Sequence, residues 1–114
     1  MTTIVLWVAD LVKSADYYKD LFEASDYYLT DGFASVSGSE NEVLLHLAPE
    51  EYAGQISVGE ENPIKPVFRV SSLEQARAVA SKHGCTFVAE SIEHDGVHFL
   101  DGKDPTGHVI QVSC

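Results

Sequence analysis

Apolar and polar residues recur in short segments along the chain, and their spacing predicts two similar halves. In the first half, a β-rich run at residues 3–8 precedes a helix that Asp10 or Ser14 can cap, because both side chains accept hydrogen bonds from helix N–H groups. The apolar residues of this helix follow the i, i+3, i+4 spacing of one face, at Tyr18, Leu21 and Phe22. Three short strands are then expected at residues 25–29, 33–37 and 42–48.

The second half repeats this order of elements. A strand is predicted at residues 64–70, and a helix begins at Ser72, which forms a capping box with Gln75 and ends at Gly84. Its apolar face consists of Leu73, Ala76, Val79 and Ala80. Three further strands are expected at residues 86–89, 94–100 and 108–113. Between the halves, residues 49–62 are acidic and lack periodicity, as is typical of a linker.

Direct sequence matches between the halves indicate an internal repeat. Residues 31–38 read Asp-Gly-Phe-Ala-Ser-Val-Ser-Gly and residues 95–102 read Asp-Gly-Val-His-Phe-Leu-Asp-Gly. Two more matches occur in the same order, Val8–Leu11 with Val70–Leu73 and Leu45–Leu47 with Ile110–Val112. We therefore interpret each half as one strand–helix–strand–strand–strand module, in which His46 is matched with Gln111.

The alternation of side chains along the strands indicates which face of each predicted sheet is buried and which is open. In an α+β fold of this kind, the uniformly apolar sides pack under the helices. The other sides are mixed and should face a cavity or solvent. They carry Thr3, Trp7, His46, Lys65, Arg69 and Gln111.

Composition narrows the possible partners. The chain has 114 residues and a net charge of −11, from 18 acidic and 7 basic residues, which disfavours nucleic-acid binding. The acidic excess either serves solubility or indicates a preference for cationic ligands. No run of 18 apolar residues and no basic leader is present, so we expect no membrane segment and a cytoplasmic protein. Cys85 and Cys114 lack CxxC spacing and are expected to be free thiols.

Three motifs together resemble the vicinal oxygen chelate superfamily, which includes glyoxalase I, fosfomycin resistance proteins, extradiol dioxygenases and bleomycin resistance proteins. They are Val8-Ala9-Asp10-Leu11 with Ser14, Tyr17 and Tyr18; Phe68-Arg69-Val70; and Asp104-Pro105-Thr106-Gly107-His108. The resemblance covers the whole chain. It implies two βαβββ modules at residues 1–48 and 63–114, joined by the linker 49–62. Their curved mixed sheets would carry helices on the convex side and a cleft on the concave side.

Where members of this superfamily hold a divalent metal, its ligands are side chains from four strands, and the matching positions here are Thr3, His46, Lys65 and Gln111. A protonated lysine has no lone pair, and the threonine hydroxyl and glutamine amide are weak ligands. We therefore expect no metal and no other cofactor. A shifted site that uses His46 with His98 stays open, if His98 shares the cavity side. His94 and His98, read as one strand, would lie about 13 Å apart.

Because the chain resembles the superfamily but lacks a good set of metal ligands, the resemblance favours the bleomycin-resistance type of function. That is metal-independent sequestration of a small molecule in the cleft of a homodimer, as in antibiotic resistance. The alternative is a metal-dependent lyase, isomerase, transferase or dioxygenase. Trp7 would either stack on the ligand or pack at an interface. His46 and His98 would either line the pocket or act as acid–base groups. Lys65 and Arg69 would either bind an anion or stay solvated. The candidate ligand-binding residues are Trp7, His46, Lys65, Arg69, His98 and Gln111.

Overall fold

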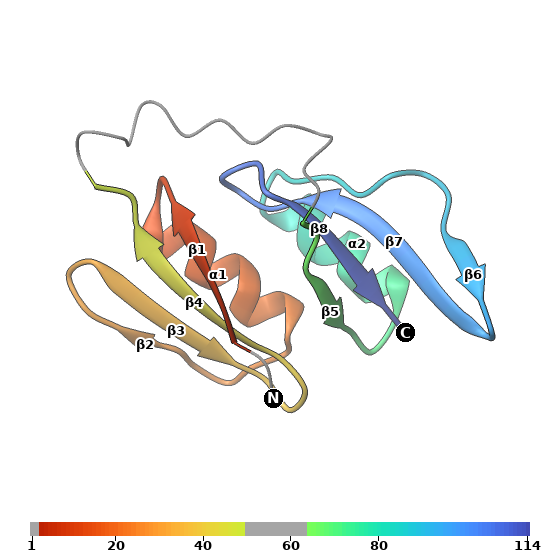
Figure 1. Ribbon diagram of the computed structural model, residues 1–114, viewed down its shortest axis with the longest axis horizontal. Helices are drawn as coiled ribbons and strands as arrows, with labels where there is room; N and C mark the ends of the chain where they lie inside the picture. The colour runs from red at the N-terminus through yellow and green to blue at the C-terminus, as the bar shows by residue number, and fades with distance from the viewer. Residues whose placement is uncertain (1–2, 50–63) are drawn as a thin grey trace. The chain divides into compact units, whose positions relative to one another are not determined.

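The computed structural model describes residues 3–49 and 64–114, which form two compact units, one from each range (Figure 1). All but one residue of the predicted linker, residues 49–62, lie outside the described ranges. Each unit contains one helix and one four-stranded mixed sheet, as the α+β prediction of two βαβββ modules requires. None of the described helices is long and apolar enough to cross a membrane.

The first unit follows the predicted order of elements. Its elements are β1 Thr3–Val8, α1 Leu11–Leu21, β2 Tyr28–Leu29, β3 Phe33–Ser37 and β4 Glu42–Leu47. The strand order in the sheet is β1-β4-β3-β2, with β1 parallel to β4 and the other pairs antiparallel. The predicted strand at residues 25–29 is shortened to its last two residues.

Helix α1 covers one face of this sheet because the apolar residues of both elements meet there. Asp10, rather than Ser14, caps the helix, since its carboxylate accepts a 3.0 Å hydrogen bond from the Lys13 N–H. The predicted apolar face is confirmed by the burial of Tyr18, Leu21 and Phe22. The strands contribute the fully buried residues Ala34, Val36, Val43 and Leu45.

The second unit has the same topology, which confirms the repeat as a duplicated architecture. Its elements are β5 Val67–Arg69, α2 Leu73–Lys82, β6 Ile92–His94, β7 Val97–Lys103 and β8 Val109–Ser113. The strand order is β5-β8-β7-β6, with β5 parallel to β8. Ser72 caps α2 by accepting a 3.0 Å hydrogen bond from the Gln75 N–H, and Gly84 follows the helix at φ +71°.

The structure corrects the predicted strands of the hairpin region. Residues 86–89 form no strand and make a single bridge, between Phe87 and Gly102. The sixth strand is Ile92–His94, and a turn with positive φ at Asp95 (50°) and Gly96 (81°) leads into β7. Asp-Gly suits such a turn because both residues tolerate positive φ. His94 and His98 therefore lie on different strands, contrary to the prediction of one strand.

The Asp104–His108 motif is a half-buried turn between β7 and β8, with Asp104 as its buried residue. Asp104 is 3% exposed, and its Oδ1 accepts hydrogen bonds from the N–H groups of Thr106 (2.9 Å), Gly107 (3.0 Å) and His108 (2.9 Å). Gly107 adopts φ +102°, which side chains with a Cβ rarely adopt. This arrangement satisfies three backbone donors with one oxygen, so the motif has a structural role.

Replacing Asp104 with alanine should lower the free energy of unfolding by about 1–3 kcal/mol, because it removes the buried acceptor of three part-buried hydrogen bonds. Urea denaturation monitored by circular dichroism measures this. Glu90→Ala, at an exposed position, serves as the control and should change stability by less than about 0.5 kcal/mol. Equal effects of the two variants would contradict the role given to Asp104.

Candidate functional site

An acidic side chain that the sequence analysis did not single out organises the open face of the second sheet, the face opposite α2. Asp101 on β7 lies directly across from Gln111 on β8. Its Oδ1 accepts a 2.9 Å hydrogen bond from Gln111 Nε2, and its Oδ2 accepts one of 3.0 Å from Lys65 Nζ. Two of the predicted ligand-binding residues are thus brought together by a third residue.

The surroundings of Asp101 keep its carboxylate charged. Partial burial raises the pKa of Asp101, but the hydrogen bonds from Lys65 and Gln111 and the positive charge of Lys65 together outweigh burial. The net pKa lies below the ordinary value for an aspartate. Lys65 and Asp101 therefore form an ion pair at neutral pH, with side chains that are 35% and 33% exposed.

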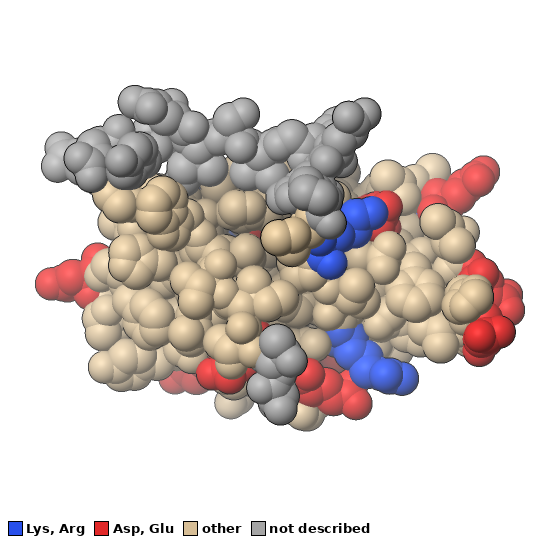
Figure 2. Space-filling model, in the orientation of Figure 1, with Lys and Arg blue, Asp and Glu red and all other residues tan. Residues whose placement is uncertain are grey.

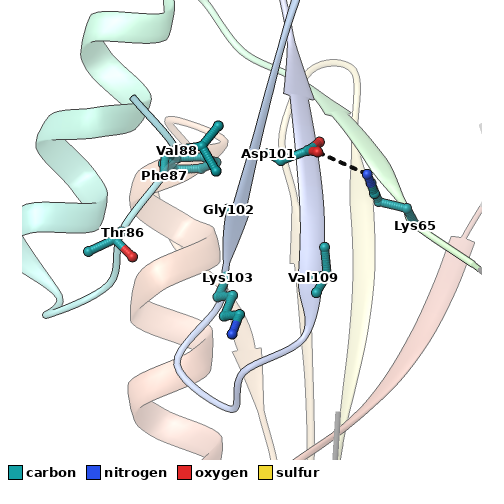
Figure 3. Close-up of a pocket in the computed structure, with 8 residues that line it drawn as sticks. All are labelled: Lys65, Thr86, Phe87, Val88, Asp101, Gly102, Lys103 and Val109. Carbon is teal, nitrogen blue, oxygen red and sulfur yellow. Dashed lines mark hydrogen bonds and ion pairs between the residues drawn. The ribbon is translucent and has the colours of Figure 1, made fainter. Parts of the chain in front are cut away.

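A hollow of about 370 Å³ adjoins this ion pair (Figure 3). Its lining comes from the segment before β6, from β7 and β8, and from the residue pair before β5. The lining residues are Lys65, Thr86, Phe87, Val88, Asp101, Gly102, Lys103 and Val109. The hollow therefore combines an ion pair, a second lysine, a hydroxyl group and apolar surface.

The wall of the hollow formed by residues 86–88 is held from two directions. The Val88 N–H donates to the Asp101 carbonyl at 2.8 Å, and the Lys103 N–H donates to the Thr86 carbonyl at 3.2 Å, so this segment runs beside β7. Arg77 on α2 donates from Nη1 to the Val88 carbonyl and from Nη2 to the Ala89 carbonyl, both at 2.8 Å. These bonds fix the wall although it forms no regular strand.

Gly102 allows the Phe87 ring to pack against β7. A Cβ atom at this position would overlap the ring, so any other residue would displace it. Because side chains alternate along β7, the buried Gly102 lies on the core side, whereas Asp101 and Lys103 point to the open face. The shape of the hollow therefore depends on one glycine and one arginine outside the polar cluster.

The open face of the first sheet, opposite α1, has a different character. Trp7 on β1, His46 on β4 and Phe33 on β3 are direct cross-strand neighbours. The Trp7 side chain is 46% exposed, and His46 is exposed as well. Figure 2 shows that uncharged residues dominate the first unit in this view. An imidazole between two aromatic rings can contact a flat ligand.

Thr3 and His46, two of the four positions matched to metal ligands, are not neighbours. Thr3 pairs with Glu42 and donates a 2.8 Å hydrogen bond from its hydroxyl to Glu42 Oε2. His46 pairs with Trp7, four positions further along the same ladder. The separation along the strands is about 13 Å.

The ladders also correct the match between His46 and Gln111. Val5 pairs with Leu44 in the first unit, and Val67 pairs with Gln111 in the second. Since the repeat matches β1 with β5, the structural counterpart of Gln111 is Leu44. His46 corresponds instead to Ser113, two residues later. The sequence match was wrong here because two short apolar strands align equally well in either register.

The remaining candidates, Arg69 and His98, lie on different faces. Arg69 is exposed on the open face of the second sheet, where it pairs with Ser113. His98 exchanges backbone hydrogen bonds with Cys114 and lies on the same face of β7 as the buried Leu100. The possibility that His98 shares the cavity side is excluded, because alternation places its side chain on the other face of β7 from that of Asp101.

The four matched positions do not fit a divalent metal. The Lys65 ammonium has no lone pair and is bound to Asp101, and the Gln111 amide donates to the same carboxylate. Thr3 donates its hydroxyl proton to Glu42. Within residues 3–49 and 64–114, no three His, Cys, Asp or Glu side chains gather closely enough to hold a metal ion.

Comparison with known proteins identifies the fold of this chain. No protein-family model and no curated protein matches the sequence. Solved structures do match. A glyoxalase/bleomycin resistance protein from Albidiferax ferrireducens T118 has a TM-score of 0.73 at 19% identity, over 99% of this chain and 96% of that chain. The chain has the vicinal oxygen chelate fold.

Two further structures with this fold carry different names. A glyoxalase/bleomycin resistance protein/dioxygenase family enzyme from Burkholderia phytofirmans PsJN has a TM-score of 0.70 at 16% identity, over 97% of this chain and 94% of that chain. The fosfomycin resistance protein FosX from Mesorhizobium loti has a TM-score of 0.71 at 10% identity, over 99% and 89%. Such identities establish a shared vicinal oxygen chelate fold, while function depends on the site.

The lowered pKa of Asp101 predicts a pH-dependent contribution to stability. A carboxyl group with a lowered pKa in the folded state stabilises the protein above its unfolded pKa of about 3.9, and this contribution is lost as the pH falls through the folded pKa. We expect Asp101→Asn to lower the free energy of unfolding by up to about 1 kcal/mol at pH 6, because the pair is partly exposed. The difference should shrink below about pH 4.

Urea denaturation of both proteins between pH 3 and pH 7 measures this difference. Glu90→Gln is the control, since it also removes one exposed carboxylate. A difference between wild type and Asp101→Asn that is the same at every pH would contradict the ion pair.

Proposed function

We propose that this protein binds a small molecule on the open faces of its vicinal oxygen chelate modules without the help of a metal ion. The observation that carries the proposal is the ion pair that Lys65 forms with Asp101. Lys65 occupies a position matched to a metal ligand, yet its ammonium group lies 3.0 Å from Asp101 Oδ2 in an ion pair. A cation at this position repels a metal ion electrostatically.

Binding without turnover is the form of this function that the side chains support best. The proposed role is sequestration, as in the bleomycin-resistance type of protein, and the homodimer and cytoplasmic location belong to the same proposal. Two of the similar structures carry bleomycin resistance in their names. Light scattering of the purified protein tests the dimer, for which a mass of 12.4 kDa would indicate a monomer.

The first unit offers the surface for a flat, cationic ligand. Trp7 and Phe33 flank His46 across three strands, and aromatic faces attract cations. A net charge of −11 raises the local concentration of cations around the whole chain. These features favour an aromatic or quaternary ammonium group on this face.

The purified protein should contain no stoichiometric metal. Protonated Lys65 offers no lone pair, and Gln111 and Thr3 are weak neutral ligands, so divalent ions should be lost on dialysis against a weak chelator. Inductively coupled plasma mass spectrometry measures the content. One equivalent of nickel, zinc, manganese or iron per chain would overturn the proposal and favour a metal-dependent enzyme.

The fluorescence of Trp7, the single tryptophan, should respond to an aromatic cation. We expect phenyltrimethylammonium to change the emission and to bind more tightly than benzenesulfonate, by about fivefold, because the ring faces and the acidic chain favour the cation. In Trp7→Leu, calorimetry should show weaker binding of the cation. Equal affinity for the two probes, or none at millimolar concentration, would count against this surface.

A further inference from the structure

The lining of the hollow in the second unit contains more basic than acidic side chains, unlike the chain as a whole. The chain carries 18 acidic and 7 basic residues, but two lysines and one aspartate line the hollow. In the view of Figure 2, basic and acidic side chains both lie over the second unit. Because electrostatic interactions weaken beyond about 8 Å at physiological salt, the charges of the lining matter more to a ligand in the hollow than charges beyond that distance do.

The single acid of the lining is already neutralised by the protein. Asp101 accepts one hydrogen bond on each carboxylate oxygen, from Gln111 and from Lys65. An ammonium group has three N–H donors, so Lys65 can bind Asp101 and a second acceptor together. Lys103 adds a further positive charge on the same face of β7, and Thr86 adds a hydroxyl group.

We propose that this hollow binds the carboxylate of a small organic acid, with Lys65 and Lys103 as its cationic contacts. The inference rests on the proposed small-molecule binding and assigns a ligand class to one of its surfaces. A carboxylate between two ammonium groups would extend the Asp101–Lys65–Gln111 network, with charges of alternating sign.

The rest of the lining suits a short apolar chain on the same ligand. Val88 and Val109 line the hollow beside the polar residues, and Val88 is 50% exposed. Covering this surface would remove apolar area from water. The volume of about 370 Å³ lies near the lower end of the range of about 300–1,000 Å³ for small-ligand pockets. A short aliphatic carboxylate matches both the size and the chemistry.

The test compares three probes of equal chain length that differ only in the head group: hexanoate, hexylammonium and hexanol. They are added to the metal-free full chain, labelled with ¹⁵N, at pH 7. We expect hexanoate to shift the amide signals of Val88, Lys103 and Val109, and to bind at least about fivefold more tightly than either other probe. Hexylammonium binding as tightly as hexanoate at these amides would overturn the proposal.

Three variants separate charge recognition from a general effect on the fold. Lys103→Gln should weaken hexanoate binding about fivefold. Lys13→Gln removes the same charge from the exposed face of α1 and should leave binding unchanged. Asp101→Asn should strengthen binding, because Lys65 then loses its competing carboxylate. A merely structural role for Asp101 would weaken binding instead, and thermal unfolding confirms that each variant is folded.

The outcomes distinguish this inference from the proposed function. If hexanoate does not bind at millimolar concentration, or if both lysine variants behave alike, the anion site is overturned while the metal content and the Trp7 titration still stand. Stoichiometric metal in the purified protein would overturn the proposed function. The charge preference of the hollow would then still be measured on the metal-free protein.

Discussion

The register of one central strand in each unit determines which side chains meet on the open face. Strand β4 lies between β1 and β3, and β8 lies between β5 and β7, each with one parallel and one antiparallel neighbour. Buried residues on one side, such as Val43 and Leu45 on β4, oppose a slip by one residue because it would turn them toward solvent. The opposite side is then determined as well. Gln111 meets Asp101 because Ile110 and Val112 must be buried.

The same constraint explains how much of the molecule could be read from sequence. The period of apolar residues was sufficient for both helices and for the four strands of the first unit, of which β2 is shorter than predicted. The hairpin of β6 and β7 was misread as one strand because the residues flanking Asp95 look equally strand-like. Pairing of the strands, rather than local preference, decides that β6 ends at His94.

The candidate site was only partly predictable for a related reason. Alternation correctly placed Trp7, His46, Arg69 and Gln111 on the open faces. It could not reveal that the structural counterpart of Gln111 is Leu44 rather than His46, two residues away on β4. The apolar residues of the two strands align equally well in either match. Alternation also could not reveal Asp101, whose importance arises from the two strands that bring it to Gln111 and Lys65. Long-range pairing supplies this information, and a single sequence does not contain it directly.

The net charge of the chain and the charges that line the hollow favour different ligands in the two proposals. A charge of −11 attracts cations over distances comparable with the Debye length, and this affects how ligands approach. Within a hollow, however, a ligand interacts with the groups at its walls. There Asp101 is held by Lys65 and Gln111, so its negative charge is already compensated, while Lys103 adds positive charge. The ligand class of a small pocket therefore follows from its paired and shared charges rather than from the composition of the chain.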